Sequence, residues 1–380
     1  MTWLEIRPED VWLFRDGKPF AAGEDHSAHS MFPPTPLTVQ GALRQKISVS
    51  LGVSLREYKA AKTDNARKAV EYIGSHGELR QLGKFRMRGP FISLRTETSL
   101  VPLFPAPADL LKHNKTNEFR ISKPNQTLLS DLEGDFHFPE VIEDYENLPG
   151  HWMTADTFEQ YLANTPPNSV TFNEGSEHQD PLTAYQNGKR IWHNKLIYQN
   201  DDRFGVSTNA LTSFREEGQL YQVQFVRPQR GIGLLVSVSN DIPTNLLAGA
   251  MNIGGEQRQA NAALIENVVM PSRSISNHFK VTFLTPAYFD DGWQPKNGDW
   301  STVFGHSITL KSAVVYRPWK LGGWNSAENR ARAMHNYIAP GSVYYFETEQ
   351  SFSPPDALTQ EMDGINAQAL GFGQYAISQW

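Results

Sequence analysis

The segment KFRMR, residues 84–88, alternates cationic with apolar side chains. Successive side chains of a strand point to opposite faces, so a strand here carries three cations on one face and two apolar residues on the other. The apolar face can pack on a core while the cationic face holds phosphate groups. A solvated outer face that binds nothing explains the same pattern equally well.

A second group of cations is interleaved with aromatic residues near the C-terminal end. It contains Arg317, Lys320, Arg330, Arg332 and His335 together with Trp319, Trp324 and Tyr337. Aromatic rings can stack on unpaired bases while neighbouring cations contact phosphates. Surface cations beside core tryptophans are the alternative interpretation.

Two glycine-containing segments could approach a phosphate with bare backbone: NIGGEQRQ, residues 252–259, and GFGQY, residues 371–375. Glycine lets backbone N–H groups come close to an anion and permits positive φ. The nucleotide-hydrolysis motif G-x-x-x-x-G-K-[ST] does not occur in the sequence. We therefore expect no nucleotide hydrolysis.

The histidines of EDHSAHS, His26 and His29, stand beside two acids and could act as an acid/base pair or hold a metal ion. Histidines in a solvated loop are the more common case. Neither an H-E-x-x-H nor a D-x-D-x-D-G pattern occurs, so we expect no metal site and no cofactor.

The local elements needed to position these residues begin with a helix over residues 35–51. Thr35 is a suitable N-cap, Pro36 suits the first helical position, and apolar residues recur every four positions from Val39. Gly41 and Arg44 lie off this apolar stripe. Gly41 could admit a sugar-phosphate backbone or allow close packing of the helix on a sheet.

Period-two patterns and turn residues predict an α+β protein with antiparallel sheets. The expected strands are residues 2–7, 85–95, 98–104, 219–226, 231–239, 260–268, 279–287, 308–317 and 342–348, and the other expected helices are 56–74 and 242–251.

Charge divides the chain into three regions. Residues 111–200 hold seven basic and thirteen acidic side chains, so they account for the whole net charge of −6. We expect a first unit over 1–110, an acidic, loop-rich insertion over 111–200 and a second unit over 201–380. The absence of cysteine fits a reducing compartment, and no apolar run is long enough to span a bilayer, so we expect a soluble, cytoplasmic protein.

Several motifs resemble one known family in collinear order. They are FRDGKPF (14–20), MFPPTPLTVQGALR (31–44), RGPF (88–91), DRFGV (202–206), EEGQLYQVQFVR (216–227), IGGEQRQ (253–259), LGGWN (321–325), PGSVYYFE (340–347) and GFGQYAI (371–377). The sequence is similar to the RAMP-type subunit of the type III-B CRISPR effector (Cmr complex) that holds the 5′ tag of the guide RNA. The resemblance spans both ends of the chain but not the insertion.

The resemblance implies two ferredoxin-like (RRM-like) units and a subunit that binds RNA without catalysing a reaction. Its implied partners are the crRNA, the target RNA, the large palm-domain catalytic subunit and a backbone RAMP subunit, with a role at the foot of the complex in antiviral defence. It also implies a thumb hairpin, which we place at residues 185–200 because a basic Asn-Gly turn joins aromatic segments there. The acidic insertion either points away from RNA or docks a basic neighbour.

Two other functions remain open at this stage. One is a RAMP endoribonuclease that processes precursor crRNA with His26 or His29 as general base, and the other is an assembly subunit without direct RNA contact. For the favoured RNA-binding function, we expect the cations and glycines to meet in one groove. The expected RNA-binding residues are Ser30, Gly41, Arg44, Lys84, Arg86, Arg88, Arg203, Gly254, Gly255, Arg258, Lys320, Trp324, Gly371, Phe372 and Gly373.

Overall fold

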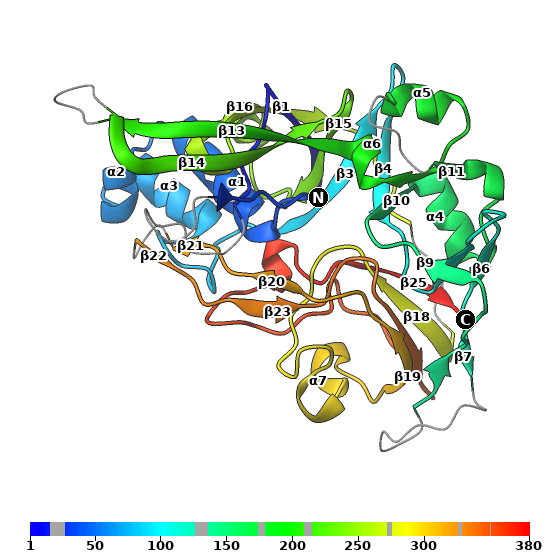
Figure 1. The fold of residues 1–380 in the computed structure, drawn as a ribbon. Coiled ribbons are helices and arrows are strands. Elements are labelled where there is room, and N and C mark those ends of the chain that lie inside the picture. The colour runs from blue at the N-terminus through cyan, green and yellow to red at the C-terminus, as the bar shows by residue number, and fades with distance from the viewer. Residues whose placement is uncertain are drawn as a thin grey trace.

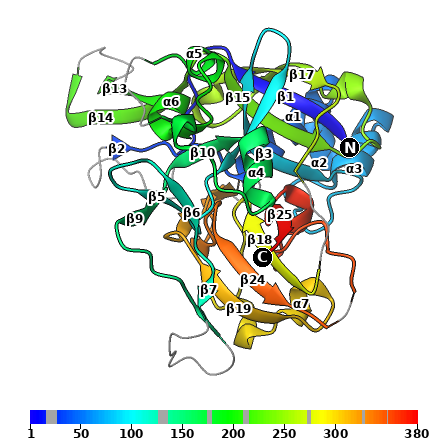
Figure 2. The same cartoon turned by 90° about the vertical axis from the view of Figure 1, so that its right-hand side faces the viewer.

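A nine-stranded sheet and a four-stranded sheet organise the chain (Figures 1 and 2). The structure is a computed structural model that describes residues 1–15, 27–125, 136–173, 179–208, 215–271, 276–325, 329–349 and 351–380. His26 and most of the motif at 14–20 lie outside the described residues. The observed fold is mixed α+β with mostly antiparallel pairing, as the sequence predicts.

The nine-stranded sheet draws its strands from three distant parts of the chain. In spatial order they are β11 (Phe172–Asn173), β12 (Ile191–His193), β10 (His151–Thr154), β4 (Leu100–Pro105), β3 (Met87–Arg95), β15 (Ile232–Val238), β1 (Thr2–Pro8), β17 (Gln259–Ile265) and β16 (Gly249–Asn252). Pairing is antiparallel except between β11 and β12. Strands β15 and β17, from the last part of the chain, flank β1 from the first part. The boundaries expected at residues 110 and 200 therefore divide the strands of a single sheet.

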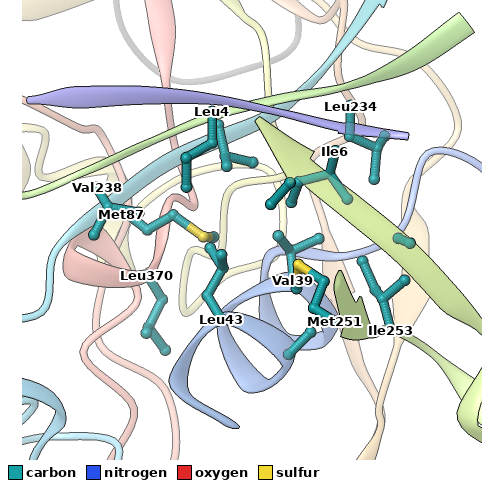
Figure 3. Close-up of a cluster of buried hydrophobic side chains, with 14 of the residues drawn as sticks. Leu4, Ile6, Val39, Leu43, Met87, Leu234, Val238, Met251, Ile253 and Leu370 are labelled. Atoms are coloured by element: carbon teal, nitrogen blue, oxygen red, sulfur yellow. The ribbon is translucent and has the colours of Figure 1, made fainter. Parts of the chain in front are cut away.

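Helix α1 (Pro36–Ser50) covers one face of this sheet. The Thr35 hydroxyl accepts a hydrogen bond from the Thr38 amide and Pro36 starts the helix, which confirms the predicted capping. Val39 and Leu43 are fully buried against apolar side chains of β1, β3, β15 and β16 (Figure 3). Burial of this stripe therefore fixes which face of α1 remains open to solvent.

Two sequence-based helix predictions are wrong. Residues 56–74 form two helices, α2 (Leu55–Ala60) and α3 (Asp64–Ile73), because Ala61 is left-handed and the Thr63 side chain caps a new start. Residues 242–251 form the short turn η2 (Thr244–Leu246) and the start of β16, since pairing of β16 with β17 overrides the local preference.

The four-stranded sheet has the order β19 (Thr309–Val314), β24 (Val343–Glu347), β18 (His278–Phe283) and β25 (Tyr375–Gln379), all antiparallel. One face packs on an aromatic core around Trp300, next to α7 (Ser301–Phe304). The other face is polar and buried: Lys280 lies there, 3.0 Å from Asp109, which precedes β5 (Leu110–His113).

Two long ribbons extend from these sheets. The hairpin of β13 (Tyr198–Thr208) and β14 (Arg215–Pro228) runs along one edge of the molecule from α6 (Asn194–Ile197) (Figure 1). The short strand β2 (Ser27–Ala28) pairs with β14. The second ribbon pairs β20 (Trp319–Leu321) with β23 (His335–Tyr337) and β21 (Trp324–Asn325) with β22 (Arg330–Ala331). No hairpin forms at residues 185–200, where Asn187 and Gly188 instead end α5 (Pro181–Gln186).

The insertion is more ordered than the sequence predicts. It supplies β10, β11 and β12 to the large sheet, and α4 (Ala155–Leu162) packs on β4 with Phe158 and Tyr161 fully buried. Its other strands are β6 (Phe119–Ile121), β7 (Pro124–Asn125), β8 (Phe138–Pro139) and β9 (Tyr145–Asn147). The described residues also contain the short turns η1 (Ser169–Thr171), η3 (Gly255–Gln257), η4 (Lys296–Gly298) and η5 (Gln368–Leu370).

Candidate nucleic-acid interface

The extended segment after β1 connects the long hairpin with the glycine-rich loop. Trp12 exchanges two backbone hydrogen bonds with Val226 of β14, both 2.8 Å long, and the Gly255 amide donates to the Leu13 carbonyl at 2.8 Å. Ser30 belongs to the same region because its hydroxyl accepts a hydrogen bond from the Phe14 amide. Ser30, the 253–258 loop and β13–β14 therefore lie in one region of the molecule.

Gly254 is the position in this loop where a side chain cannot fit. Its φ is +79°, and an added Cβ would lie 2.4 Å from the Leu13 carbonyl oxygen. At Gly255, φ lies outside the left-handed region and the nearest atom to an added Cβ is the tip of the Leu13 side chain at 3.0 Å. The loop geometry thus depends on glycine at 254 much more than at 255.

Three guanidinium groups collect where the hairpin meets this loop, and we call Arg203, Arg227 and Arg258 the arginine cluster. Two of them lie over the ring of Phe225, with the guanidinium carbons of Arg203 and Arg258 4.8 Å and 4.5 Å from the ring centre. Phe225 is only 2% exposed. The stacking holds these cations in place by contact with a rigid, buried ring.

Carboxylates accompany each member of the arginine cluster. Asp201 accepts from Arg203 Nε at 3.0 Å and from Arg227 at 2.6 Å, and Asp10 accepts from Arg227 at 2.7 Å. Hydrogen bonds from Arg203 and then Arg227 lower the pKa of Asp201 to about 2. Glu256 pairs with Arg258 at 2.8 Å. The cluster is therefore held as ion pairs at neutral pH.

Arg44, Lys84 and Arg86 form a second group, around α1 and the end of α3. Arg44 donates to the Ser75 carbonyl at 3.2 Å, and Arg86 donates to the carbonyls of Gly83 and Phe85. Arg86 also lines a cavity of about 470 Å³ together with Val70, Gly74, Ser75, Glu78, Arg80, Gln81, Leu82 and Gly83.

The predicted alternation over 84–88 is confirmed. Phe85 and Met87 are at most 1% exposed, whereas Lys84 and Arg86 are exposed and Arg88 is half-buried. The regular strand begins only at Met87. Each cation has a partner: Lys84 pairs with Glu71 and Arg88 with Asp356.

The GFG segment is a packing feature, which contradicts its predicted stacking role. Phe372 is completely buried and stacks on Tyr337 with the ring centroids 5.4 Å apart, so its face is closed to a base. An added Cβ at Gly371 or Gly373 would lie 2.3 Å from the backbone oxygen of Gly89 or Leu358. Both glycines therefore permit close approach of protein backbone.

Lys320 and Trp324 lie on the second ribbon, in β20 and β21. Lys320 is exposed and the Trp324 side chain is 60% exposed, so its ring is accessible for stacking. The ribbon is tied to the body by the His335 Nε2–Asp363 contact of 2.6 Å. The neighbouring Glu361 pairs with Arg80, which lines the cavity of the second group.

His29 is exposed just after β2. In the part of the chain that the structure describes, no three histidine, aspartate or glutamate side chains are grouped to hold a metal ion. Among the same described ranges, no helix has the length and apolar character needed to cross a bilayer.

A family model described as CRISPR-associated protein (Cas_Cmr3) matches residues 4–380. The chain belongs to the Cmr3 family. The resemblance inferred from the collinear motifs is thereby confirmed. No curated protein matches the sequence.

Solved structures with similar chains have low identity to this Cmr3-family protein. A chain in the cryo-EM structure of the Type III-B Cmr-beta bound to cognate target RNA and AMPPnP has 18% identity and a TM-score of 0.48, and the match covers 90% of this chain and 86% of that one. A chain in the crystal structure of the Csm3–Csm4 subcomplex of the type III-A CRISPR-Cas interference complex has 9% identity and a TM-score of 0.43, with coverage of 92% and 93%.

The cations and glycines that the sequence predicts to meet in one groove lie in separate groups in this Cmr3-family chain. Val39 of α1 packs beside Ile253 near the glycine-rich loop, while Leu43 packs beside Met87 and Leu370 (Figure 3). Helix α1 thus lies between the loop and the region of Arg88 and the GFG segment.

Sequence reasoning missed Arg227, Phe225, Asp10 and Asp201. The missing information was the register of the hairpin. Asp201 lies opposite Phe225 in β13–β14, and Arg203 lies opposite Val223, so Phe225 and Arg227 share a face with the predicted Arg203. Side chains alternate between the two faces of a strand, so QVQFVR by itself shows that Phe225 and Arg227 share a face. It does not show that Arg203 lies on the same face, because that depends on how β13 pairs with β14.

Proposed function

We propose that this protein is a non-catalytic RNA-binding subunit of a type III-B CRISPR (Cmr) effector complex that holds the 5′ tag of the crRNA. It acts in the cytoplasm at the foot of the complex during RNA-guided antiviral defence. Its partners are the crRNA, the target RNA, the large palm-domain subunit and a backbone RAMP subunit.

One observation carries the proposal: the arginine cluster lies against a glycine-rich loop at the base of a long hairpin. Guanidinium groups bind phosphates through paired donors, and a glycine loop lets the backbone of a nucleic acid approach closely. Single-stranded RNA is typically bound through such phosphate contacts together with stacked bases. Trp324 on the second ribbon supplies an accessible ring for stacking.

Strand order supports two ferredoxin-like units as part of this proposal. The order β17-β1-β15-β3 places the first and third strands in the centre, and β25-β18-β24-β19 repeats that arrangement. A helix follows the first strand in each unit, α1 in one and α7 in the other. We accordingly propose that residues 232–265 complete the first unit and that residues 276–380 form the second. The thumb is then β13–β14 rather than residues 185–200.

Arg258→Ala tests the RNA-binding proposal. We expect the affinity for crRNA carrying its 5′ tag to fall about 3- to 10-fold and the dependence of log K on log salt to flatten by about 0.7, since one phosphate contact is lost. Fluorescence anisotropy over a salt series measures both. Arg120→Ala is the matched control, because Arg120 also stacks on an aromatic ring, that of Tyr145, but lies in the insertion. Equal slopes for Arg258→Ala and the wild type contradict the proposal.

Gly41→Ala distinguishes the two explanations of this glycine. An added Cβ meets no atom within 4 Å, so close packing of α1 on the sheet does not require glycine here. Alanine in a helix interior should raise the free energy of unfolding by about 0.5–1 kcal/mol. If RNA lies against this exposed position, affinity should fall about threefold while stability rises. Higher stability with unchanged affinity removes Gly41 from the interface.

A further inference from the structure

One carboxylate of the arginine cluster, Asp201, contacts Arg203 in the geometry that a phosphate uses, whereas Asp10 and Glu256 contact Arg227 and Arg258 through one oxygen each. Asp201 engages Arg203 with both oxygens, Nε to Oδ1 at 3.0 Å and Nη2 to Oδ2 at 3.1 Å. Arginine binds carboxylate and phosphate oxygens through the same planar pair of donors. The paired donors of Arg203 are therefore already engaged by the protein.

The three carboxylates differ in how easily a ligand can displace them. Asp201 is 21% exposed and pairs with both Arg203 and Arg227, so it holds the base of the hairpin together. Asp10 and Glu256 are 54% and 46% exposed. Exposed ion pairs contribute little stability, so replacing either of these two by a phosphate costs little.

Arg258 retains a donor that its carboxylate partner does not satisfy. Its Nη2 group pairs with Glu256, but its Nε is buried and forms no hydrogen bond within the described residues. A buried donor without an acceptor is unfavourable, so an acceptor that reaches this nitrogen gains stability from it. A phosphate oxygen that displaces Glu256 could accept from this nitrogen as well.

We propose that Asp10 and Glu256 act as displaceable substitutes for phosphate that suppress binding of unrelated RNA to the arginine cluster. This inference rests on the proposed RNA-binding function and adds a determinant of specificity to it. Three carboxylates neutralise the three guanidinium groups of the arginine cluster. An RNA strand whose phosphates are only loosely placed therefore gains little binding free energy by displacing these carboxylates. A strand fixed in register by its other contacts presents phosphates to the cluster together and displaces both side chains.

The test compares Glu256→Gln with the wild-type full chain on two probes, oligouridylate and the crRNA 5′ tag. We expect Glu256→Gln to bind oligouridylate about 3- to 10-fold more tightly, with a salt slope steeper by about 0.7, because one more phosphate is engaged. Affinity for the tag should change less, so discrimination between the probes falls. Asp10→Asn lies on a different element and should shift binding in the same direction.

Glu347→Gln is the matched control because it removes one paired carboxylate, that of the Lys311 pair, from the four-stranded sheet. Thermal unfolding of each variant shows whether it is folded. If Glu256→Gln is not folded, the affinity of Asp10→Asn for oligouridylate tests the inference in its place. The proposed function requires that the wild type binds the tag and that Arg258→Ala weakens that binding. If both hold and Glu256→Gln binds oligouridylate no more tightly than the wild type does, the inference is wrong while the proposed function stands. If neither the wild type nor any variant binds RNA, both are wrong.

Discussion

Asp109→Asn is expected to lower the free energy of unfolding by about 3–5 kcal/mol at pH 7, because it leaves a buried charge without its counter-ion. The Lys280 ammonium lies 3.0 Å from the Asp109 carboxylate, and the two side chains are 1% and 0% exposed. Asparagine is close in shape to aspartate but carries no charge. Urea unfolding at pH 7 measures the loss.

The surroundings of Asp109 explain why the loss should be large. Tyr161 donates to one carboxylate oxygen at 2.7 Å, and Tyr345 and Lys280 donate to the other at 2.6 and 3.0 Å. Lys280 also lies 4.0 Å from the centre of the Tyr161 ring. These residues come from α4, from two strands of the four-stranded sheet and from the segment before β5. The network therefore fixes how the second sheet packs on the insertion.

The loss should shrink as the pH rises. Burial lowers the pKa of Lys280 below its ordinary value, and the Asp109 charge opposes that shift. Without Asp109 the folded-state pKa falls further, while the unfolded chain keeps the ordinary value of about 10.4. Between these two pKa values the unfolded state binds more protons, so the stability of the variant increases with pH. A deficit independent of pH would show that charge is not its cause.

Lys280→Met in the Asp109→Asn background completes a double-mutant cycle. The double variant should be more stable than the sum of the single losses predicts, by about 2 kcal/mol, because neither member leaves an unpaired charge. Additive losses would mean that the two side chains act independently.

Elements with local signals could be predicted from the sequence. The Thr35 cap, Pro36 and the apolar stripe define α1 within one segment, and the alternation over 84–88 fixes which side chains are buried. Strand pairing could not be predicted in the same way. Thr2 pairs with Val238, and nothing in either segment specifies the other. Sequence patterns alone therefore assign the strands of this one sheet to three separate regions of the chain.

The candidate site shows the same limit. The GG and GFG segments have similar composition, yet only the former lies at the hairpin, whereas Phe372 is buried in the core. Composition cannot tell whether a glycine admits a ligand or the protein's own backbone. Asp10, which pairs with Arg227, is 217 positions away from it, so the neutralised state of the arginine cluster was not visible in the sequence.

Gly254→Ala should have the largest effect on RNA binding, a loss of at least about tenfold. Gly254 has φ +79° and ψ −162°, a region that is essentially restricted to glycine and that costs other residues about 1–3 kcal/mol. The added Cβ would also lie 2.4 Å from the Leu13 carbonyl oxygen, which accepts the Gly255 amide. The loop must therefore move, and Arg258 moves away from Phe225 with it. Anisotropy with crRNA measures the affinity, and circular dichroism shows whether the remaining fold is retained.

Gly255→Ala separates this geometric effect from a general intolerance of the loop. Its added Cβ meets first the tip of the Leu13 side chain at 3.0 Å, which can rotate away, and its φ lies outside the left-handed region. We expect its affinity for RNA to stay within about twofold of the wild type, since flexible side-chain ends relieve small overlaps at low cost. If both variants lose affinity equally, backbone conformation at 254 is not what positions the arginine cluster. If neither loses affinity, the glycine-rich loop lies outside the RNA-binding surface.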